Sequence, residues 1–259
     1  MSRLSLIVCA LVLVGGSAIA EVIGLDIVYR HGDQRLVGYL AYEVKDNRIR
    51  PGVLICPEWW GINDYVRQRA RELAELGLMV FVCDIYGDST STTSWEEAPK
   101  LAKPFYEDRD LMRERVAIGL WTLRNHTLCD KGRIAAIGYC FGGTCALELA
   151  RSGAEVQGVV SFHGGLNTPD PEDAKNIKTK VLVCHGADDP FVNADEVAAF
   201  QNEMRDAGVD WQMNIYGGAV HSFTNPVSGD DPSTGVAYNV DADRRSWDAM
   251  MMFFEEIFK

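Results

Sequence analysis

The chain has 259 residues, of which 47% are hydrophobic and 24% charged, and its formal net charge is −12. This length is sufficient for one large α/β domain or two smaller domains. Because an acidic surface repels phosphate backbones and anionic lipid, nucleic acid is not expected as a partner.

The first 20 residues have the pattern of a secretory signal peptide. Arg3 supplies a positive start, residues 4–14 form an apolar core too short for a good membrane span, and Ala18-Ile19-Ala20 fits the small-x-small cleavage pattern. We predict cleavage after Ala20, with an uncleaved N-terminal anchor as the alternative. The mature protein is then expected to be secreted or periplasmic, without stable membrane insertion.

Short apolar runs alternate with helical patterns in the rest of the chain. An antiparallel edge hairpin is predicted from residues 22–29 and 36–43. Further strands are predicted at 52–57, 78–84, 133–139, 156–162, 180–185 and 211–216. Helices are predicted at 63–76, capped by Asn63 and stopped by Gly77, and at 108–126, 141–151, 193–206 and 241–258.

This alternation predicts an α/β fold, with a mostly parallel central sheet and helices on both of its faces. Because no repeat or low-complexity linker divides the chain, residues 21–259 are expected to form a single domain. Two irregular segments, 87–94 and 224–239, follow strands at the edge of the sheet where α/β sites are built, so they are candidate walls of a site.

A reactive cysteine is suggested by residues 138–143, GYCFGG, which link a predicted strand to a predicted helix. Cys140 lies between Gly138 and Gly142 in the spacing of a nucleophile elbow, where larger flanking residues would collide with the adjoining strand or helix. The N-terminus of the following helix favours a thiolate at Cys140. Taken alone, the stretch fits a nucleophile and a small residue in a tight turn equally well.

A nucleophile elbow needs a base and an orienting acid, in the chain order nucleophile, acid, histidine. Only one histidine, His221, follows the later acidic candidates, and it lies on a loop after a strand. Asp188 and Asp189 both follow the strand predicted at 180–185, and the residues alone do not choose between them. The alternative for either is a turn-forming aspartate.

The other histidines and cysteines suggest structural roles. His163 and His185 lie at strand ends before a glycine, and we expect them to make structural hydrogen bonds. Cys56, Cys83 and Cys184 lie in apolar strand-like runs, where free cysteine behaves as a small hydrophobe, although one disulfide remains open. The sequence contains no metal cluster, phosphate loop or dinucleotide fingerprint, so neither metal nor cofactor is expected.

Several separate motifs, taken in order from about Leu36 to the end of the chain, resemble the dienelactone hydrolase family. They are PEWWGIN at 57–63, DIYG at 84–87, GYCFGG at 138–143, GADDPFV at 186–192 and HSF at 221–223. The resemblance implies a single-domain α/β-hydrolase fold with a Cys-His-Asp triad. It implies Cys140 as nucleophile and His221 as base. Because the family's acid precedes a Phe-Val pair, it places the orienting acid at Asp189.

The resemblance implies further site residues. Glu58 matches a glutamate thought to pair with the cysteine, and its value must lie in accepting the thiol proton, since a carboxylate cannot stabilise a thiolate by charge. The oxyanion hole would use the backbone N–H groups of Phe141 and Trp59. Aromatic walls of the pocket are expected from Trp59, Trp60, Tyr86 and Phe223. Packing in the core is the alternative for each of these four.

Two positions depart from the family's pattern. In members that cleave dienelactone, two arginines grip the substrate carboxylate, and the matching positions here hold Asp88 and Asn225. Their loss removes a charge-assisted clamp, so we expect a neutral ester, lactone or thioester as the small-molecule substrate. The expected reaction is hydrolysis through a covalent acyl-enzyme.

Two other functions stay open at this point. The same fold also serves non-catalytic binding proteins. Alternatively, Cys140 is a redox or disulfide residue, because export implies an oxidising compartment. Asn125-His126-Thr127 matches a glycosylation sequon, which applies only if the source is a eukaryote. The sequence sets no oligomeric state.

Overall fold

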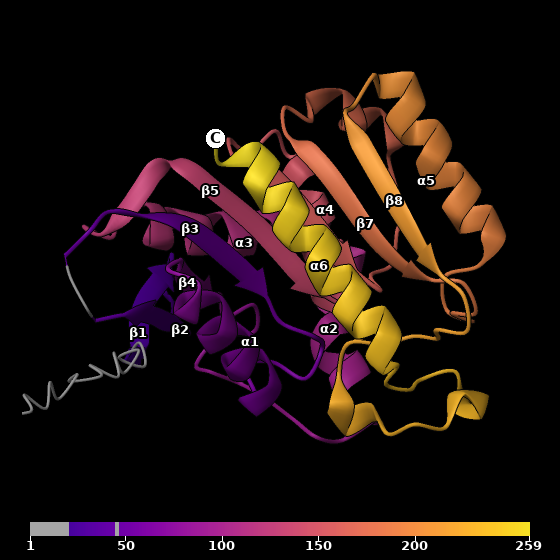
Figure 1. Cartoon of the computed structure of the whole chain (residues 1–259), viewed down its shortest axis with the longest axis horizontal. Coiled ribbons are helices and arrows are strands. Elements are labelled where there is room, and N and C mark those ends of the chain that lie inside the picture. The colour runs from indigo at the N-terminus through magenta and orange to yellow at the C-terminus, as the bar shows by residue number, and fades with distance from the viewer. Residues whose placement is uncertain (1–20, 45–46) are drawn as a thin grey trace, which may run out of the picture.

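One eight-stranded sheet forms the centre of the molecule (Figure 1). The computed structural model describes residues 21–44 and 47–259, so the predicted signal peptide lies outside the described residues. The strands are β1 Val22–His31, β2 Gln34–Glu43, β3 Arg50–Cys56, β4 Met79–Val82, β5 Cys129–Tyr139, β6 Gly158–Phe162, β7 Lys180–Gly186 and β8 Trp211–Tyr216.

The strand order is β1-β2-β4-β3-β5-β6-β7-β8. β1 and β2 form an antiparallel hairpin at the edge, β2 is antiparallel to β4, and all the other neighbouring strands in this order are parallel. This confirms the predicted α/β fold, including its mostly parallel sheet and its N-terminal antiparallel hairpin.

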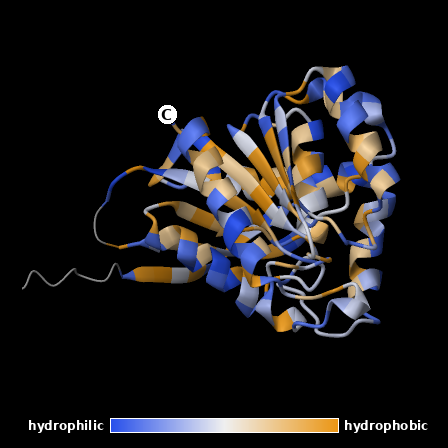
Figure 2. Ribbon diagram, turned by 45° about the vertical axis from the view of Figure 1, so that its right-hand side comes forward, coloured by the Kyte–Doolittle hydropathy of each residue, from blue (hydrophilic) through white to orange (hydrophobic). Residues whose placement is uncertain are grey.

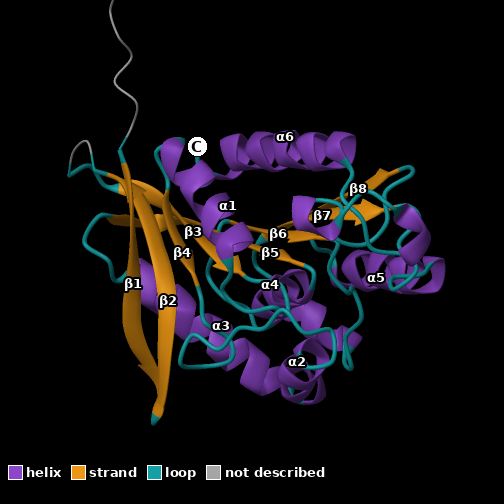
Figure 3. Cartoon of the chain, turned by 90° about the horizontal axis from the view of Figure 1, so that it is seen from below, coloured by secondary structure: helices purple, strands orange, loops and turns teal. Residues whose placement is uncertain are grey.

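Helices cover both faces of the sheet, as predicted. They are α1 Asp64–Glu75, α2 Ala98–Glu107, α3 Arg109–Arg124, α4 Phe141–Arg151, α5 Ala194–Ala207 and α6 Val240–Ile257. α1 and α6 lie on one face, and α2, α3, α4 and α5 lie on the other (Figure 3). Hydrophobic residues run along the strands, whereas the outer sides of the helices are largely hydrophilic (Figure 2). Among the described residues, no helix combines the length and apolarity that a bilayer crossing requires.

Capping residues set the starts of several helices. Asn63 precedes α1, and its side chain accepts a hydrogen bond from the Val66 amide. Asp108 and Asn193 cap α3 and α5 in the same way. After α1 the chain turns at Gly77, whose φ of +86° is in the region that favours glycine. The predicted cap and stop of this helix are confirmed.

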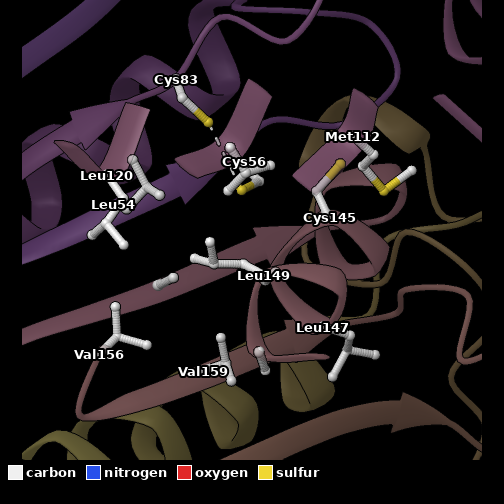
Figure 4. Packing of buried hydrophobic residues seen from close by; sticks show 14 of the residues in the cluster. Leu54, Cys56, Cys83, Met112, Leu120, Cys145, Leu147, Leu149, Val156 and Val159 are labelled. Atoms are coloured by element: carbon white, nitrogen blue, oxygen red, sulfur yellow. Dashed lines mark hydrogen bonds between the residues drawn. The ribbon is translucent and has the colours of Figure 1, made fainter. Parts of the chain in front are cut away.

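The core beneath α4 is rich in sulfur (Figure 4). Cys56 and Cys83 lie side by side, with 3.8 Å between their Sγ atoms, and Cys145 of α4 belongs to the same cluster. All three are fully buried, and the six described cysteines are free thiols. The prediction that Cys56, Cys83 and Cys184 pack as small hydrophobic residues is confirmed by their burial.

Candidate active site

Cys140 lies in a strained turn between β5 and α4. Its φ of 53° is one that residues other than glycine rarely adopt. A Cβ atom at Gly138 would lie 1.8 Å from the Gly142 carbonyl oxygen, and one at Gly142 would lie 2.0 Å from the Cys56 carbonyl oxygen. Both glycines are therefore required by the close approach of backbone segments, which is the physical basis of the elbow pattern.

A cysteine, a histidine and an aspartate meet at the carboxyl ends of the strands. His221 Nε2 lies 3.1 Å from Cys140 Sγ, and His221 Nδ1 lies 2.8 Å from Asp189 Oδ2. Asp189 is buried, and its other oxygen accepts a hydrogen bond from the Phe191 amide at 2.9 Å. Asp188 instead accepts from a backbone amide in the turn after β8. The choice that the residues left open thus falls on Asp189.

The electrostatics of His221 follow from its two neighbours. Burial lowers the pKa of His221, but the Cys140 sulfur and the Asp189 carboxylate outweigh this effect and raise the pKa to about 10. Negative charge on both sides of the ring favours the imidazolium. The N-terminus of α4 begins directly after Cys140 and favours negative charge on the sulfur. The arrangement is therefore suited to a thiolate–imidazolium pair.

The two loop segments predicted to be walls bond to His221 and to the loop after β3. In the segment 224–239, the Gly235 carbonyl accepts a hydrogen bond from the His221 amide, and the Ala237 amide donates to the His221 carbonyl. In the segment 87–94, the Thr92 amide donates to the Trp60 carbonyl at 3.0 Å. These backbone contacts hold the base and the loop after β3 in place.

Glu58 is buried against the loop that carries His221. Among the described residues, its carboxylate accepts hydrogen bonds from Ser222 Oγ at 3.2 Å and from Asn225 Nδ2 at 2.8 Å. In this structure the Cys140 sulfur pairs with His221 instead, so the pairing of Glu58 with Cys140 that is expected when substrate enters stays a prediction. Burial raises the pKa of Glu58, and the hydrogen bonds from Asn225 and Ser222 offset only part of this rise.

The two amides expected in the oxyanion hole belong to neighbouring segments. Phe141 is the first residue of α4, and amides in the first turn of a helix have no acceptor within it. Trp59 follows Glu58 on the loop after β3, and its carbonyl accepts from the Tyr86 hydroxyl at 2.9 Å. The Tyr86 ring also stacks on Phe141, with 5.9 Å between the ring centroids. Tyr86 therefore ties the two segments together.

The expected aromatic walls divide into two groups. Trp59 and Trp60 pack edge to face at 5.4 Å, and both contact Trp95, which is 59% exposed. Phe223 is fully buried against the ring of His163. Phe223 is thus a core residue, which was the alternative interpretation of the sequence.

Sequence reasoning missed further aromatic residues beside the triad. Phe191 is 60% exposed and lies edge-on to His221 at 5.4 Å, and Tyr106 packs against Phe141 at 5.3 Å. The position of Phe191, two residues after Asp189, was a signal that could have found it. Tyr106 and the preceding Trp95 lie in or beside α2, a helix that was not predicted.

The two departures from the family's pattern have different surroundings. Asp88 is exposed, and its carboxylate binds Arg35 and Gln34 of β2 at 3.2 Å each. Asn225 is buried and donates to Glu58, while its Oδ1 accepts from the Val227 amide at 3.0 Å. Both side chains thus have protein partners.

The mostly parallel sheet, the elbow after β5 and the Cys-His-Asp arrangement define the class of the protein as an α/β hydrolase. The model of the dienelactone hydrolase family matches residues 36–258. The chain belongs to this family, as the sequence motifs predicted.

Individual relatives agree with this assignment. The solved structure m3DLH is 41% identical, covers 92% of this chain and 99% of its own, and superposes with a TM-score of 0.88. A dienelactone hydrolase-like promiscuous phosphotriesterase from metagenomic libraries is 39% identical, with coverages of 91% and 98% and a TM-score of 0.87. A Bradyrhizobium protein named "Probable 2-oxo-3-(5-oxofuran-2-ylidene)propanoate lactonase" is 30% identical over 74% of this chain and 80% of its own.

Proposed function

We propose that the protein hydrolyses a small neutral carboxylic ester, lactone or thioester, with Cys140 as the nucleophile. The observation that carries this proposal is the alignment of Cys140, His221 and Asp189, with contacts of 3.1 and 2.8 Å. Membership of the dienelactone hydrolase family supports hydrolysis of esters or lactones. The name of the Bradyrhizobium relative supports a lactone among the candidates.

The reaction begins with the Cys140 proton on His221. The thiolate attacks the substrate carbonyl carbon, and the carbonyl oxygen becomes an oxyanion that accepts hydrogen bonds from the Phe141 and Trp59 amides. The intermediate then collapses, and His221 donates its proton to the leaving alkoxide. Next, His221 removes a proton from water, which attacks the thioester and releases the acid and the Cys140 thiolate. Asp189 holds the tautomer of His221 throughout.

We assign Glu58 a positioning role. Its carboxylate binds Ser222, the residue directly after His221, and Asn225, which lies further along the same loop. Because the Cys140 sulfur already has His221 as a hydrogen-bond partner at 3.1 Å, the base for the thiol does not need to be Glu58. Glu58 then acts by fixing the loop from which His221 projects.

The proposal of a neutral substrate is supported by the two positions that matched the family's arginines. The Asn225 amide group is committed to Glu58 and to the Val227 amide, and Asp88 is paired with Arg35. No guanidinium is supplied from either position, so a substrate carboxylate would lack the clamp expected of dienelactone-cleaving members.

A neutral phosphotriester is a second candidate substrate. A relative of 39% identity is a promiscuous phosphotriesterase, and its length matches this chain closely. A phosphotriester carries no negative charge, so it fits a site without a cationic clamp. Attack by Cys140 at phosphorus would place the phosphoryl oxygen at the same two amides and expel an aryloxide, which takes the proton from His221. Water activated by His221 would then cleave the P–S bond and release the phosphodiester and the Cys140 thiolate.

The test uses the purified chain with p-nitrophenyl esters, neutral and carboxylated lactones, a thioester and a neutral aryl phosphotriester. We expect turnover of neutral carboxylic substrates and less than about 0.1% of it in Cys140→Ala, because the nucleophile is lost. Cys145→Ala, which changes a buried core thiol, is the matched control and should stay active.

A mass increase on the Cys140 peptide during turnover would identify the acyl-enzyme. Full activity of Cys140→Ala would refute the proposal. A folded wild type that neither turns over any substrate nor reacts with a thiol probe would favour a binding protein. A native disulfide at Cys140 would favour a redox role.

A further inference from the structure

We propose that His163 is a positioning residue for the nucleophile, and that it couples the Cys140 turn to the loop that carries His221. The proposal rests on the proposed function, because it assigns a role to His163 in reactions at Cys140. It concerns a histidine outside the triad.

His163 is held rigidly at the end of β6. It is fully buried, its φ of 40° is unusual for a residue other than glycine, and its amide donates to the Cys184 carbonyl at 2.9 Å. Such backbone strain persists only where the surrounding structure over-determines the conformation. The strained backbone turns the imidazole toward the neighbouring strained turn at Cys140.

The ring contacts the nucleophile through the backbone. His163 Nδ1 accepts a hydrogen bond from the Cys140 amide at 3.1 Å, and the same amide also donates to the Phe162 carbonyl at 3.0 Å. An accepting Nδ1 has no proton, so the proton of the neutral ring is on Nε2. One tautomer of His163 is therefore defined by its contact with Cys140.

The opposite nitrogen reaches the loop of the base. His163 Nε2 donates to Thr224 Oγ1 at 2.7 Å, and the Thr224 and Tyr65 hydroxyls are hydrogen-bonded to each other at 2.7 Å. The Thr224 carbonyl accepts from Arg69 at 2.8 Å. Thr224 lies three residues after His221, so one imidazole bridges the backbone of the nucleophile and the loop of its base.

The ring performs this role only when it is neutral. A protonated His163 would have to donate from Nδ1, where the Cys140 amide already points its own proton. The ring also lies 5.4 Å from that of His221, which carries the positive charge of the proposed ion pair. Burial, followed by the charges of His221 and Arg69, lowers the pKa of His163 well below its usual value.

The bridge sets the distance on which the reaction depends. Cys140 and His221 are carried by separate turns, and their side chains must stay 3.1 Å apart for the proton transfer. Displacement of reacting groups by about 1 Å can reduce rates by about 100-fold. We therefore expect loss of the bridge to lower kcat while changing KM little, because substrate contacts are retained.

Three variants at one position test this inference. His163→Asn places an amide oxygen near the position of Nδ1 and can still accept from Cys140. His163→Gln places its amide near the position of Nε2 and can reach only Thr224. His163→Ala keeps neither contact. We expect kcat to fall by about 30- to 100-fold in the Ala and Gln variants and by less than about fivefold in the Asn variant.

A second readout needs no turnover. The rate of iodoacetamide alkylation at the Cys140 peptide is measured against pH, and its midpoint reports how readily the thiolate forms. We expect a higher midpoint in the Ala and Gln variants, because His221 is less well aligned, and a midpoint near the wild-type value in the Asn variant. Failure of the proposed reaction would leave this readout intact, so the two failures are distinguishable.

The inference is overturned if all three folded variants match the wild type in kcat and alkylation midpoint, or if the Asn variant is as impaired as the Gln variant. If none of the three variants folds, Thr224→Val decides the question. It preserves the shape of the threonine but removes the acceptor of Nε2. A several-fold lower kcat would support the bridge, and a wild-type kcat would overturn it.

Discussion

Substitution of Glu58 by glutamine separates a positioning role from a proton-transfer role. The glutamine side chain has almost the same shape and can keep both hydrogen bonds, with its oxygen facing the Asn225 amide and its NH2 group facing Ser222. Ser222 can accept because its own hydroxyl proton has a second acceptor in Ser228 at 2.9 Å. The substitution thus removes the charge and the proton acceptor, but it leaves the loop held.

The expected effect on stability follows from the contacts. Glu58→Gln should change the free energy of unfolding by no more than about 1 kcal/mol at low pH, because no buried donor loses its acceptor. Glu58→Ala leaves the buried Asn225 amide without its acceptor, which costs about 1–3 kcal/mol. The alanine variant is therefore expected to be the less stable of the two.

The difference in stability between the wild type and Glu58→Gln is expected to depend on pH. Burial raises the pKa of Glu58 in the folded protein above 4.5, its ordinary value. The folded state therefore favours the protonated acid, and its stabilising contribution is complete below this ordinary value and is lost as the pH rises through the raised pKa. Wild-type stability should fall relative to Glu58→Gln from about pH 4.5 upward, and then the difference should become constant.

Urea unfolding of both proteins at a series of pH values measures this difference, and steady-state kinetics measure the function. We expect kcat/KM of Glu58→Gln within about threefold of the wild type, and that of Glu58→Ala lower by about 10- to 100-fold, because the loop of His221 is no longer held. A stably folded Glu58→Gln variant as inactive as Cys140→Ala would refute the reasoning, because it would show that Glu58 itself accepts the proton.

Two further substitutions test the triad and the turn. Asp189→Asn should lower kcat by about 100-fold, or about 2.7 kcal/mol in the barrier, since the His221 imidazolium loses its carboxylate partner; steady-state kinetics with unchanged kcat would contradict this. Gly142→Ala should prevent soluble folding, because its Cβ would lie 2.0 Å from the Cys56 carbonyl oxygen. Gly217→Ala, with no atom within 4 Å of the added carbon, is the control, and equal circular dichroism and melting of both variants would contradict the prediction.

Strongly patterned elements could be predicted from the sequence almost to the residue. α4 and β8 have the predicted bounds, Phe141–Arg151 and Trp211–Tyr216. α2 was missed, although its buried residues Ala98, Ala102 and Phe105 have helical spacing. Pro104 lies inside this helix, and proline normally ends one because it lacks an N–H donor. Pro104 therefore argued locally against a helix, whereas the spacing of the buried residues that pack on the core favoured one.

The site also has a part that could be predicted from the sequence and a part that could not. Chain order and motif spacing were sufficient to predict that Cys140 and His221 meet an acid after β7, because successive parallel strands end at one edge of the sheet. They left Asp188 and Asp189 open, and the family resemblance selected Asp189. The partner of Glu58 could not be predicted in this way. This partner depends on how the loop after His221 folds back. The donor to the Glu58 carboxylate is Asn225, which occupies a position where dienelactone-cleaving members have an arginine.

Asn225 therefore connects two features of the site that the sequence treated separately. An arginine at this position would bring a positive charge beside Glu58, and the guanidinium would be able to pair with that carboxylate or with a substrate carboxylate. The shorter asparagine uses its donor for Glu58 and its acceptor for Val227, so it stabilises the loop but contributes no charge. Glu58 remains a buried acid with a raised pKa. We infer that asparagine in place of arginine at position 225 has two effects. It fixes Glu58 against the loop of His221, and it favours neutral acyl groups at Cys140.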